Sequence, residues 1–344
     1  MTTLLDVARV AGVSRATVSL VCRHSALVAE KTRLKVERAM IEVGYVYNRS
    51  AANLRSSLTN TVGLIIPDIA NPIYSDLLRG VEDVLNPLGK AVFIADTHES
   101  PERQTHFLQR MLEMRVDGLI ISVVGGTRGE ALTPYVRIGI PVVQVLRLIK
   151  DAPFDYAGIN NRLGGRRAAE HLLDLGHERI GFIGSATSPS VNQMRRRGFF
   201  DAIKSRQLPV EAMPVTECRH SFAAAAVATK NLFAMRETPT GLVCYNDPIA
   251  FGATLGLYEL GLVPGQDVSL IGFDDVEAAA NWRPPLSTMS IQARQIGTHA
   301  GTLLARRMQD IDLPVCRMVS EAILVARATT APPRVPARVP SPGF

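Results

Sequence analysis

The first sixty residues carry a pattern of apolar and polar positions that predicts short helices. Within residues 4–23, LLDVARVAGVSRATVSLVCR, two periodic apolar segments flank a glycine. The valines of the apolar face are Val7, Val10, Val13, Val18 and Val21. Ala8 is small enough for a close helix crossing, Gly12 can adopt a positive φ, and Ser14 can cap the second helix. The segment therefore predicts a helix-turn-helix.

A third helix and a short linker follow. Val36, Ala39, Met40 and Val43 recur at helical spacing and predict a helix that ends near Gly44. Residues 48–55, NRSAANLR, contain good helix formers with Asn48 as a possible cap. Isolated helices shorter than about 12 residues are marginal in water. We expect this linker to become helical only with partners.

From Thr61 the pattern changes to short apolar runs that alternate with amphipathic segments. The runs predict strands at 62–66, 91–95, 118–122, 142–145, 157–159, 179–184, near Val215, 241–245 and 268–273. The segments between them predict helices at 73–88, 101–114, 129–139, 162–175, 192–206, 222–235 and 248–260. Repeated βαβ units predict parallel sheets in two successive α/β lobes. Such lobes bind ligands at the carboxyl ends of their strands.

Charge is concentrated in the predicted helical head. The whole chain has a net charge of +6, and residues 1–60 hold nine Lys or Arg against four Asp or Glu. The remaining residues carry 29 basic against 28 acidic groups. A basic head on a near-neutral body is typical of a protein that contacts a polyanion through one end.

Several classes of function are disfavoured. No apolar run approaches the roughly 20 residues of a membrane span, and Asp6 and Arg9 interrupt any signal peptide, so we expect a cytoplasmic protein. The four cysteines form no C-x-x-C pair, which argues against a disulfide framework, and we expect no metal and no cofactor. The chain lacks the motifs G-x-S-x-G and H-E-x-x-H and any phosphate loop, so an enzyme is not expected. A periplasmic-type solute-binding protein and a non-responsive architectural DNA-binding protein remain alternatives.

Ten segments together resemble the lactose-repressor (LacI/GalR) family of bacterial transcription regulators, over residues 3 to about 333. They are DVARVAGVSRATVS (6–19), NR (48–49), VGLIIPDIANPIY (62–74), DGLII (117–121), GIPVV (139–143), GHERIGFIG (176–184), RRRGF (195–199), YND (245–247), IGFDD (271–275) and RPPLST (283–288). The resemblance implies a homodimeric regulator, in the main a repressor, that reads a palindromic operator on double-stranded DNA. It further implies that a small effector, a sugar or related polyhydroxylated metabolite, switches the protein.

The resemblance also implies a domain plan. We expect an α/β protein with an all-α helix-turn-helix head at 1–47, a hinge helix at 48–60 and a two-lobed, periplasmic-binding-protein-like body at 61–333. Lobe 1 would comprise about 61–160 plus 290–318, and lobe 2 about 161–289 plus 319–330. The Pro-rich tail from Ala331 cannot form helix or core, and we expect 334–344 to be disordered. This tail lacks leucine heptads, so we expect a dimer and no tetramer. Bound to its operator, the protein would be nucleoid-associated.

Candidate DNA-binding residues lie in the head and hinge. Arg15 and Ala16 occupy the positions that choose operator bases in the family; Arg can fork onto guanine, and Ala can contact a thymine methyl. Contact of Arg15 with phosphate alone is the alternative. Leu54 matches the family's minor-groove wedge, although dimer packing would also explain it. The further candidates are Thr3, Ser14, Thr17, Ser19, Asn48, Ala51 and Arg55.

Candidate effector-binding residues lie in the body. By resemblance, Arg195, which is expected to open a helix, hydrogen-bonds the effector, and its neighbours Arg196 and Arg197 are solvated. Asp274 follows the strand at 268–273, and Asn246 ends the strand through Val243, so both are expected in the crevice. The further candidates are Tyr74 and Phe222, for stacking, and Arg147 and Asn160. Asp275 is expected only to cap, and Asp247 followed by Pro248 is expected to be a structural N-cap.

The chain departs from the family pattern in the head and in the body. Leu20 and Arg23 stand where the family usually has Arg and Asn, Tyr47 replaces the Pro before the hinge, and Ala29 replaces the Ser that caps the third helix. In the body, Leu146-Arg147 replaces the usual Asp-Arg, and Asn160-Asn161 replaces Asp-Asn. These differences bear on the operator sequence, the stability of the hinge and the chemistry of the effector.

Overall fold

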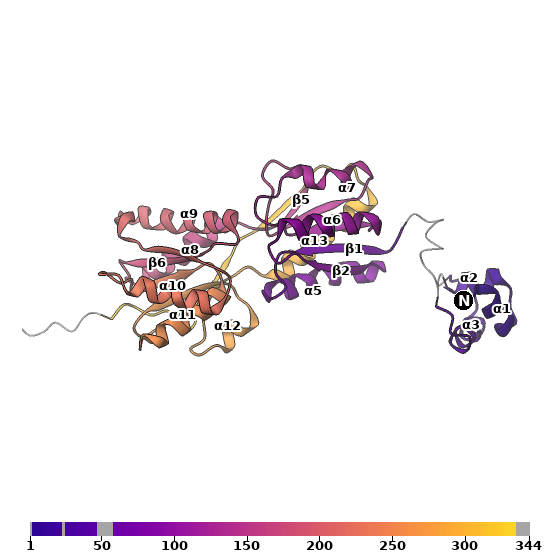
Figure 1. The fold of residues 1–344 in the computed structure, drawn as a ribbon, viewed down its shortest axis with the longest axis horizontal. Coiled ribbons are helices and arrows are strands. Elements are labelled where there is room, and N and C mark those ends of the chain that lie inside the picture. Colours follow the sequence, from indigo (N-terminus) through magenta and orange to yellow (C-terminus); the bar gives the residue numbers. More distant parts are fainter. Residues whose placement is uncertain (1, 23–24, 47–57, 335–344) are drawn as a thin grey trace, which may run out of the picture. The chain divides into compact units, whose positions relative to one another are not determined.

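The computed structural model describes residues 2–22, 25–46 and 58–334, and the chain divides into two units at Thr59 (Figure 1). The first unit contains α1 (Leu4–Ala11), α2 (Arg15–Cys22) and α3 (Glu30–Glu42). Of the predicted hinge helix at 48–60, residues 48–57 lie outside the described residues, as does the tail after residue 334.

The predicted helix-turn-helix is confirmed. The side chain of Thr3 caps α1 in a capping box with Asp6, and Gly12 ends that helix with a φ of 61°. The Ser14 hydroxyl accepts a hydrogen bond of 3.1 Å from the Thr17 amide at the start of α2. The buried core of this unit is Val7, Ala8, Ala11, Val18, Val21, Val36 and Ala39. Val10, expected on the apolar face, is 40% exposed, because it lies on the side of α1 away from this core.

The second unit contains two six-stranded sheets, each the centre of one lobe. The first sheet has the strand order β11-β5-β4-β3-β1-β2 and is parallel throughout. Its lobe consists of β1 (Thr61–Ile66), α5 (Ile73–Leu85), η1 (Asn86–Leu88), β2 (Ala91–Asp96), α6 (Pro101–Glu113), β3 (Gly118–Ile121), η2 (Gly129–Leu132), α7 (Thr133–Arg137), β4 (Val142–Val145), β5 (Asp155–Ile159), α13 (Ala293–Gln309) and β11 (Arg317–Ser320).

The second sheet has the order β12-β10-β9-β8-β6-β7. Its lobe consists of α8 (Asn161–Asp174), β6 (Ile180–Ser185), α9 (Pro189–Ser205), η3 (Val210–Ala212), β7 (Val215–Cys218), α10 (Phe222–Phe233), β8 (Gly241–Cys244), α11 (Asp247–Glu259), β9 (Ser269–Asp274), α12 (Glu277–Asn281), β10 (Ser287–Ser290) and β12 (Ile323–Val325). The edge strand β12 runs antiparallel to β10, so this sheet departs from the expected parallel arrangement.

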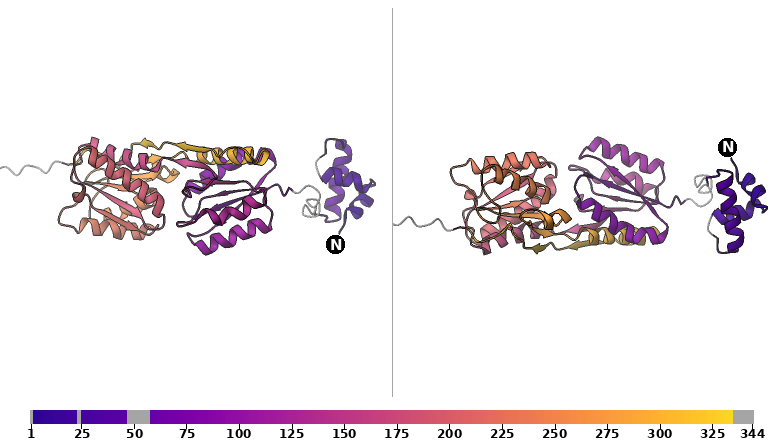
Figure 2. Two further views of the ribbon diagram at one scale, coloured as in Figure 1. Left: turned by 90° about the horizontal axis from the view of Figure 1, so that it is seen from above. Right: turned by 90° about the horizontal axis from the view of Figure 1, so that it is seen from below.

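The chain passes between the lobes three times, after β5, after β10 and after β11. Figure 2 shows the C-terminal segments, in yellow, running along both lobes. These passages explain why lobe 1 is built from two distant parts of the sequence. The pattern of apolar residues predicts no element beyond residue 273. In the structure, β11 completes the first sheet, β10 and β12 complete the second, and α13 covers one face of the first sheet.

Helices cover both faces of each sheet because successive side chains of a strand point to opposite faces. On β1, Leu64 packs in the core with α5 and α13, and Ile65 packs in the core with α6. On β6, Phe182 joins the core with α8 and α9, and Ile183 joins the core with α10 and α11. The two lobes therefore repeat one plan of layers.

Two local expectations need correction. The helix predicted at 129–139 is the short η2 followed by the five-residue α7. The tail does not leave the body at Ala331, because the Ser269 hydroxyl donates a bond of 2.8 Å to the Ala331 carbonyl. Arg334 also forms an ion pair of 2.7 Å with Asp267. In the described part of the chain, no helix is long and apolar enough to cross a membrane.

Candidate functional site

A cleft of about 550 Å³, including its opening to solvent, lies between the two lobes of the body. Lobe 1 contributes the segments that follow β1, β2 and β4, and lobe 2 contributes those that follow β6, β7, β8 and β9. The cleft thus lies at the carboxyl ends of the parallel strands, where open α/β sheets bind ligands. Its charged or ring-bearing lining residues are Asp68, Tyr74, Glu99, Arg147, Arg195, His220, Tyr245 and Asp274.

Arg195 forms the floor of the cleft on lobe 2. Its guanidinium stacks on the Phe273 ring, 3.6 Å from the centroid, and Nε donates to the Asn161 side-chain oxygen at 3.0 Å. Nη1 donates to the Tyr245 carbonyl, and Nη2 lies 3.6 Å from Oδ1 of Asp274. The side chains of Arg195 and Asp274 are only 7% and 4% exposed. Contacts from three strand ends of the protein itself therefore fix the guanidinium.

Asp274 is the second fixed group of lobe 2. Burial raises its pKa to about 6, against the opposing effect of the Arg195 charge. Its φ of 118° is a conformation that residues other than glycine rarely adopt, and such strain concentrates at functional sites. The carboxylate lies where it could accept hydrogen bonds from ligand hydroxyls.

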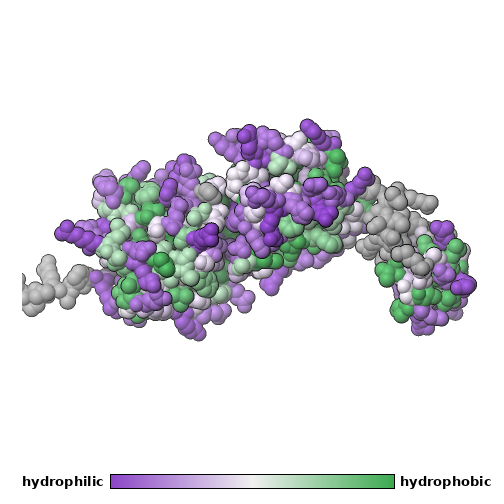
Figure 3. All heavy atoms as spheres, in the orientation of Figure 1, coloured by the Kyte–Doolittle hydropathy of each residue, from purple (hydrophilic) through white to green (hydrophobic). Residues whose placement is uncertain are grey.

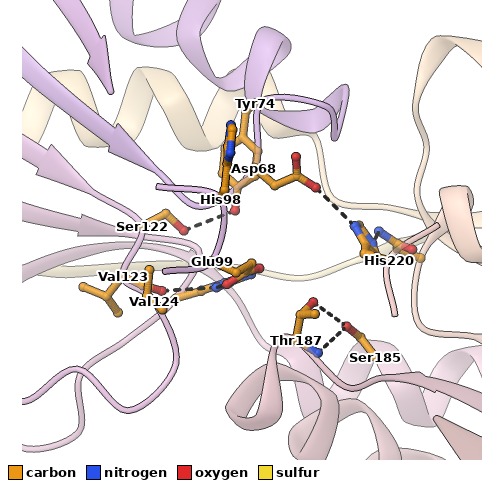
Figure 4. Close-up of polar contacts among 12 residues, drawn as sticks. Asp68, Tyr74, His98, Glu99, Ser122, Val123, Val124, Ser185, Thr187 and His220 are labelled. Atoms are coloured by element: carbon orange, nitrogen blue, oxygen red, sulfur yellow. Dashed lines mark hydrogen bonds and ion pairs between the residues drawn. The ribbon is translucent and has the colours of Figure 1, made fainter. Parts of the chain in front are cut away.

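Lobe 1 presents a second arginine-carboxylate pair. Nη1 and Nη2 of Arg147 donate to the two carboxylate oxygens of Glu99 at 2.8 and 2.6 Å, and Nη1 also faces the Val123 carbonyl at 3.3 Å. Beside this pair, the hydroxyls of Tyr74 and Ser122 lie 3.3 Å apart (Figure 4). Burial raises the pKa of Tyr74, so its phenol stays neutral.

His220 links the two lobes across the cleft. Its Nδ1 lies 3.6 Å from Oδ2 of Asp68 on lobe 1 (Figure 4). Its Nε2 lies 2.5 Å from Nδ2 of Asn246 on lobe 2. The Asn246 oxygen accepts from the Ile249 amide at 3.2 Å, which leaves the amide nitrogen facing the imidazole. An amide NH₂ only donates, so Nε2 must accept and the imidazole proton lies on Nδ1, toward Asp68.

The Asp68 carboxylate responds to this contact. The His220 ring holds the pKa of Asp68 below its ordinary value, with burial acting in the opposite direction. Asn246, His220 and Asp68 thus form a polar chain that connects the carboxyl end of β8 to the loop after β1.

Of the seven effector candidates, the structure brings five to the cleft: Tyr74, Arg147, Arg195, Asn246 and Asp274. Asn160 instead caps α8 by accepting from the Leu163 amide at 3.0 Å, and its neighbour Asn161 lines the cleft. Phe222 is 44% exposed and packs edge-on against Phe251 and Trp282, away from the cleft lining. Both placements correct the expectation.

Glu99, Asn161 and His220 are cleft residues that the sequence interpretation missed. Glu99 follows β2 and His220 follows β7, so the general rule that ligand sites lie after parallel strands could have found them. Asn161 is the first residue of α8, and Asn160 is the exposed residue before it. The direction in which the helix starts decides which of the two faces the cleft.

Three structural expectations in lobe 2 were also wrong in detail. Asn246 is the N-cap of α11, and Asp247 is its first helical residue, whose carboxylate accepts from the Val276 amide and the Thr288 hydroxyl at 2.9 and 2.5 Å. Asp275 caps no helix but pairs with Arg327 at 2.7 Å. Arg195 lies in the second turn of α9, which begins at Pro189, and does not open the helix. Arg196 faces Glu217 at 3.5 Å.

In the head, the outward side of α2 is open. Arg15 and Ala16 are exposed, and Thr17 and Ser19 are half-buried. Ser14 and Thr17 face each other with their hydroxyls 2.9 Å apart, and the Thr3 hydroxyl donates to Asp6 at 2.8 Å. The remaining candidates, Asn48, Ala51, Leu54 and Arg55, lie outside the described residues.

Comparisons with known proteins agree on the type of molecule. Residues 3–48 match the model of bacterial regulatory proteins of the lacI family, and residues 169–330 match a periplasmic binding protein-like domain. The chain is 30% identical over 313 residues to the HTH-type transcriptional repressor PurR of Aliivibrio salmonicida, covering 90% of this chain and 93% of the relative. It is 31% identical over 327 residues to the ribose operon repressor of Haemophilus influenzae, covering 95% and 98%.

Solved structures show the same similarity. The lac repressor dimer bound to operator and the anti-inducer ONPF has a TM-score of 0.82 at 27% identity, with 96% of this chain and 99% of that chain covered. A LacI family transcriptional regulator from Enterococcus faecium with bound ribose has a TM-score of 0.73 at 27% identity, with 80% and 100% covered.

Proposed function

The chain belongs to the lacI family of bacterial regulatory proteins and is a DNA-binding transcriptional regulator, and from this premise we propose that it is a repressor whose operator affinity is set by a small polar effector in the cleft. The observation that carries the proposal is the presence, in one chain, of an exposed helix-turn-helix surface and a cleft with a buried arginine-carboxylate pair on each lobe.

DNA recognition is assigned to the outward side of α2. Arg15 can form two hydrogen bonds to guanine, and the methyl group of Ala16 can contact a thymine methyl in the major groove. Thr3, Ser14, Thr17 and Ser19 are suited to phosphate and base-edge contacts. The hinge residues Asn48, Ala51, Leu54 and Arg55 are assigned to the minor groove by family position. The protein would bind its operator on the chromosome, in the cytoplasm.

A single head covers only half of a two-fold operator, so the proposal includes a dimer. Lobe 2 carries exposed apolar side chains on α10 and α11 (Figure 3). They include Phe222, Val227, Leu255 and Tyr258, which are 44%, 52%, 40% and 43% exposed. Burying them against a second copy would remove this surface from water. Phe222, which the sequence assigned to the effector, would then serve the dimer.

The effector is assigned to Arg195, Asp274 and Asn246 on lobe 2 and to Arg147 and Tyr74 on lobe 1. A ligand that contacts both lobes binds one arrangement of the lobes better than another, and it can change operator affinity only by that difference. Because the relatives are transcriptional regulators, we assign these pairs to binding and not to catalysis.

The proposed operator binding is tested by selecting duplexes from a random library and footprinting the protein on the duplex that binds most tightly. We expect a two-fold symmetric footprint, a mass of two chains in sedimentation, and an affinity that falls steeply with salt, because basic residues release counterions from DNA. Arg15→Ala should change the selected sequence, whereas the exposed control Arg128→Ala should not. A footprint without two-fold symmetry would contradict the proposal.

The dimer surface is tested with Val227→Asp, which places a charge among the exposed apolar groups of α10. We expect a single-chain mass and weaker operator binding. Val136→Asp introduces the same charge at a position on α7 that is 57% exposed, and it should leave the dimer intact. Equal masses for the two variants would place the dimer contact elsewhere.

A further inference from the structure

The two arginine-carboxylate pairs of the cleft differ in how firmly the carboxylate is held. Asp274, the partner of Arg195, is 4% exposed and ends the central strand β9. Glu99, the partner of Arg147, is 21% exposed and lies in the loop between β2 and α6. Glu99 can therefore reach water by rotating its side chain, and Asp274 cannot.

Arg147 cannot remain alone if Glu99 leaves. Its side chain is only 10% exposed, and a buried guanidinium without a partner carries a large desolvation penalty. The two Nη atoms already present a forked pair of donors to a carboxylate. This fork also fits the oxygens of a phosphate. A group that displaces Glu99 and still compensates the buried charge of Arg147 is therefore an oxyanion.

The facing side of the cleft, on lobe 2, has donors that suit such a group. Ser188, Thr187 and Ser185 line the cleft at the N-terminus of α9, a helix of 17 residues. Helix N-termini present amide donors and a positive dipole end to anions. Figure 4 shows Ser185 and Thr187 opposite Glu99, with their hydroxyls 3.2 Å apart.

Ser188 shows that this helix start is unfinished. It occupies the N-cap position, where a serine hydroxyl ordinarily accepts an amide hydrogen bond, but it makes no such bond. The residue is 2% exposed, and among the residues that the structure describes its hydroxyl has no hydrogen-bond partner. Leaving a buried hydroxyl unpaired is unfavourable. A ligand oxygen in the cleft would supply the missing partner.

We propose that the effector carries an oxyanion, a carboxylate or a phosphate, that displaces Glu99 from Arg147 and binds between this guanidinium and the Ser188 end of α9. The inference rests on the proposed effector site and names the chemical class of its ligand. Glu99 holds the position on Arg147 that the anion would take. On lobe 2 Arg195 keeps Asp274, so that pair remains available for the polar remainder of the ligand.

The test measures binding of inorganic phosphate, gluconate, glucose 6-phosphate and glucose to the full-length protein by calorimetry and thermal shift. We expect at least one of the three anions to bind and glucose, the neutral match, to bind more weakly. Glu99→Gln should raise the affinity for that anion about tenfold or more, because it removes the competing carboxylate. Arg147→Gln should abolish the binding, and Ser188→Ala should weaken it.

Glu130→Gln is the matched control, since Glu130 is exposed and lies outside the cleft lining. It should leave every affinity unchanged. The proposal is overturned if Glu99→Gln does not bind any of the anions more tightly than the wild type does, or if the anions stabilise Arg147→Gln as much as Glu99→Gln. If Arg147→Gln does not fold, the other two variants still test the proposal. Glu99→Gln should raise the affinity for the anion, and Ser188→Ala should lower it. Operator binding of the ligand-free preparations is measured in parallel, so a failure of the proposed function would be seen separately.

Discussion

The two lobes of the body share one scaffold but hold their charged groups differently. Each has a six-stranded sheet with corresponding strand order, and each has a pair of helices in backbone contact on one face. Lobe 2 fixes Arg195 with contacts from three strand ends, whereas lobe 1 holds Arg147 through Glu99, a loop residue whose side chain is 21% exposed. The scaffold thus sets where the site lies, and the residues after each strand set how rigid each half is.

The first prediction, with the largest expected effect on stability, concerns the helix pair that both lobes share. In lobe 1 a Cβ on Gly80 would lie 1.9 Å from the Arg294 carbonyl oxygen, and in lobe 2 a Cβ on Gly198 would lie 1.9 Å from the Arg162 carbonyl oxygen. Backbone atoms cannot move aside as a flexible side chain can. Gly80→Ala and Gly198→Ala should therefore each lower the free energy of unfolding by about 3 kcal/mol in urea denaturation. Gly129→Ala, whose Cβ would meet Ala152 at an ordinary 3.6 Å, is the control. A large loss in only one of the two lobes would show that the helix pairs are not equivalent.

The buried carboxyl of lobe 2 makes the second prediction. Burial raises the folded-state pKa of Asp274 to about 6, above its ordinary value of 3.8. The folded protein then binds this proton more tightly than the unfolded chain, so its contribution to stability is full below pH 4 and is lost as the pH rises through 6. Relative to Asp274→Asn, the wild type should lose about 2 kcal/mol of unfolding free energy between pH 4 and 7. Urea titrations at each pH measure this.

The exposed control Asp312→Asn should keep the wild-type pH dependence. If Asp274→Asn also keeps it, Asp274 ionises normally and the contrast between the lobes is lost.

The contact between the lobes makes the third and smallest prediction. Asp68→Asn or His220→Phe should weaken cleft closure by about 1 kcal/mol, and the double variant should lose little more than either single variant, because both remove one link. Small-angle scattering should report a larger radius of gyration for each. The Asp68 pKa is lowered in the folded state, so this stabilisation is present above pH 4 and is lost on further acidification.

Nitrogen NMR of the histidine side chains adds an independent check, since His220 should carry its proton on Nδ1. A proton on Nε2 would be incompatible with the amide nitrogen of Asn246 facing that atom.

Local chemistry accounts for what the sequence predicted well. The valines of α1 and α2, Gly12 and Ser14 define the head because each acts within one or two turns of its own position. The strands β1, β3, β4, β5, β6, β8 and β9 are almost entirely buried, which makes their apolar runs visible without a structure. The edge strands β2 and β7 are more exposed. The strands β10 to β12 were missed because they are short and partly exposed or rich in Ser and Thr.

The cleft was predicted in part for a related reason. Arg195, Asn246 and Asp274 follow strands and match family motifs, so they could be named from the sequence. The contact between His220 and Asp68 joins residues 152 positions apart, and the pairing of Arg147 with Glu99 depends on which loops meet. Such pairs follow from topology, which no local pattern contains.

Control of the head by the cleft is tested most directly by one measurement. Fluorescence anisotropy gives the affinity for a selected operator duplex, with and without a ligand found by thermal shift among neutral sugars, gluconate and glucose 6-phosphate. The wild type and Arg197→Ala, an exposed substitution on the same helix, should change their operator affinity tenfold or more on adding ligand, on the order of 1.4 kcal/mol. Arg195→Ala should bind the operator normally and show no change. An equal ligand response in Arg195→Ala would contradict the account.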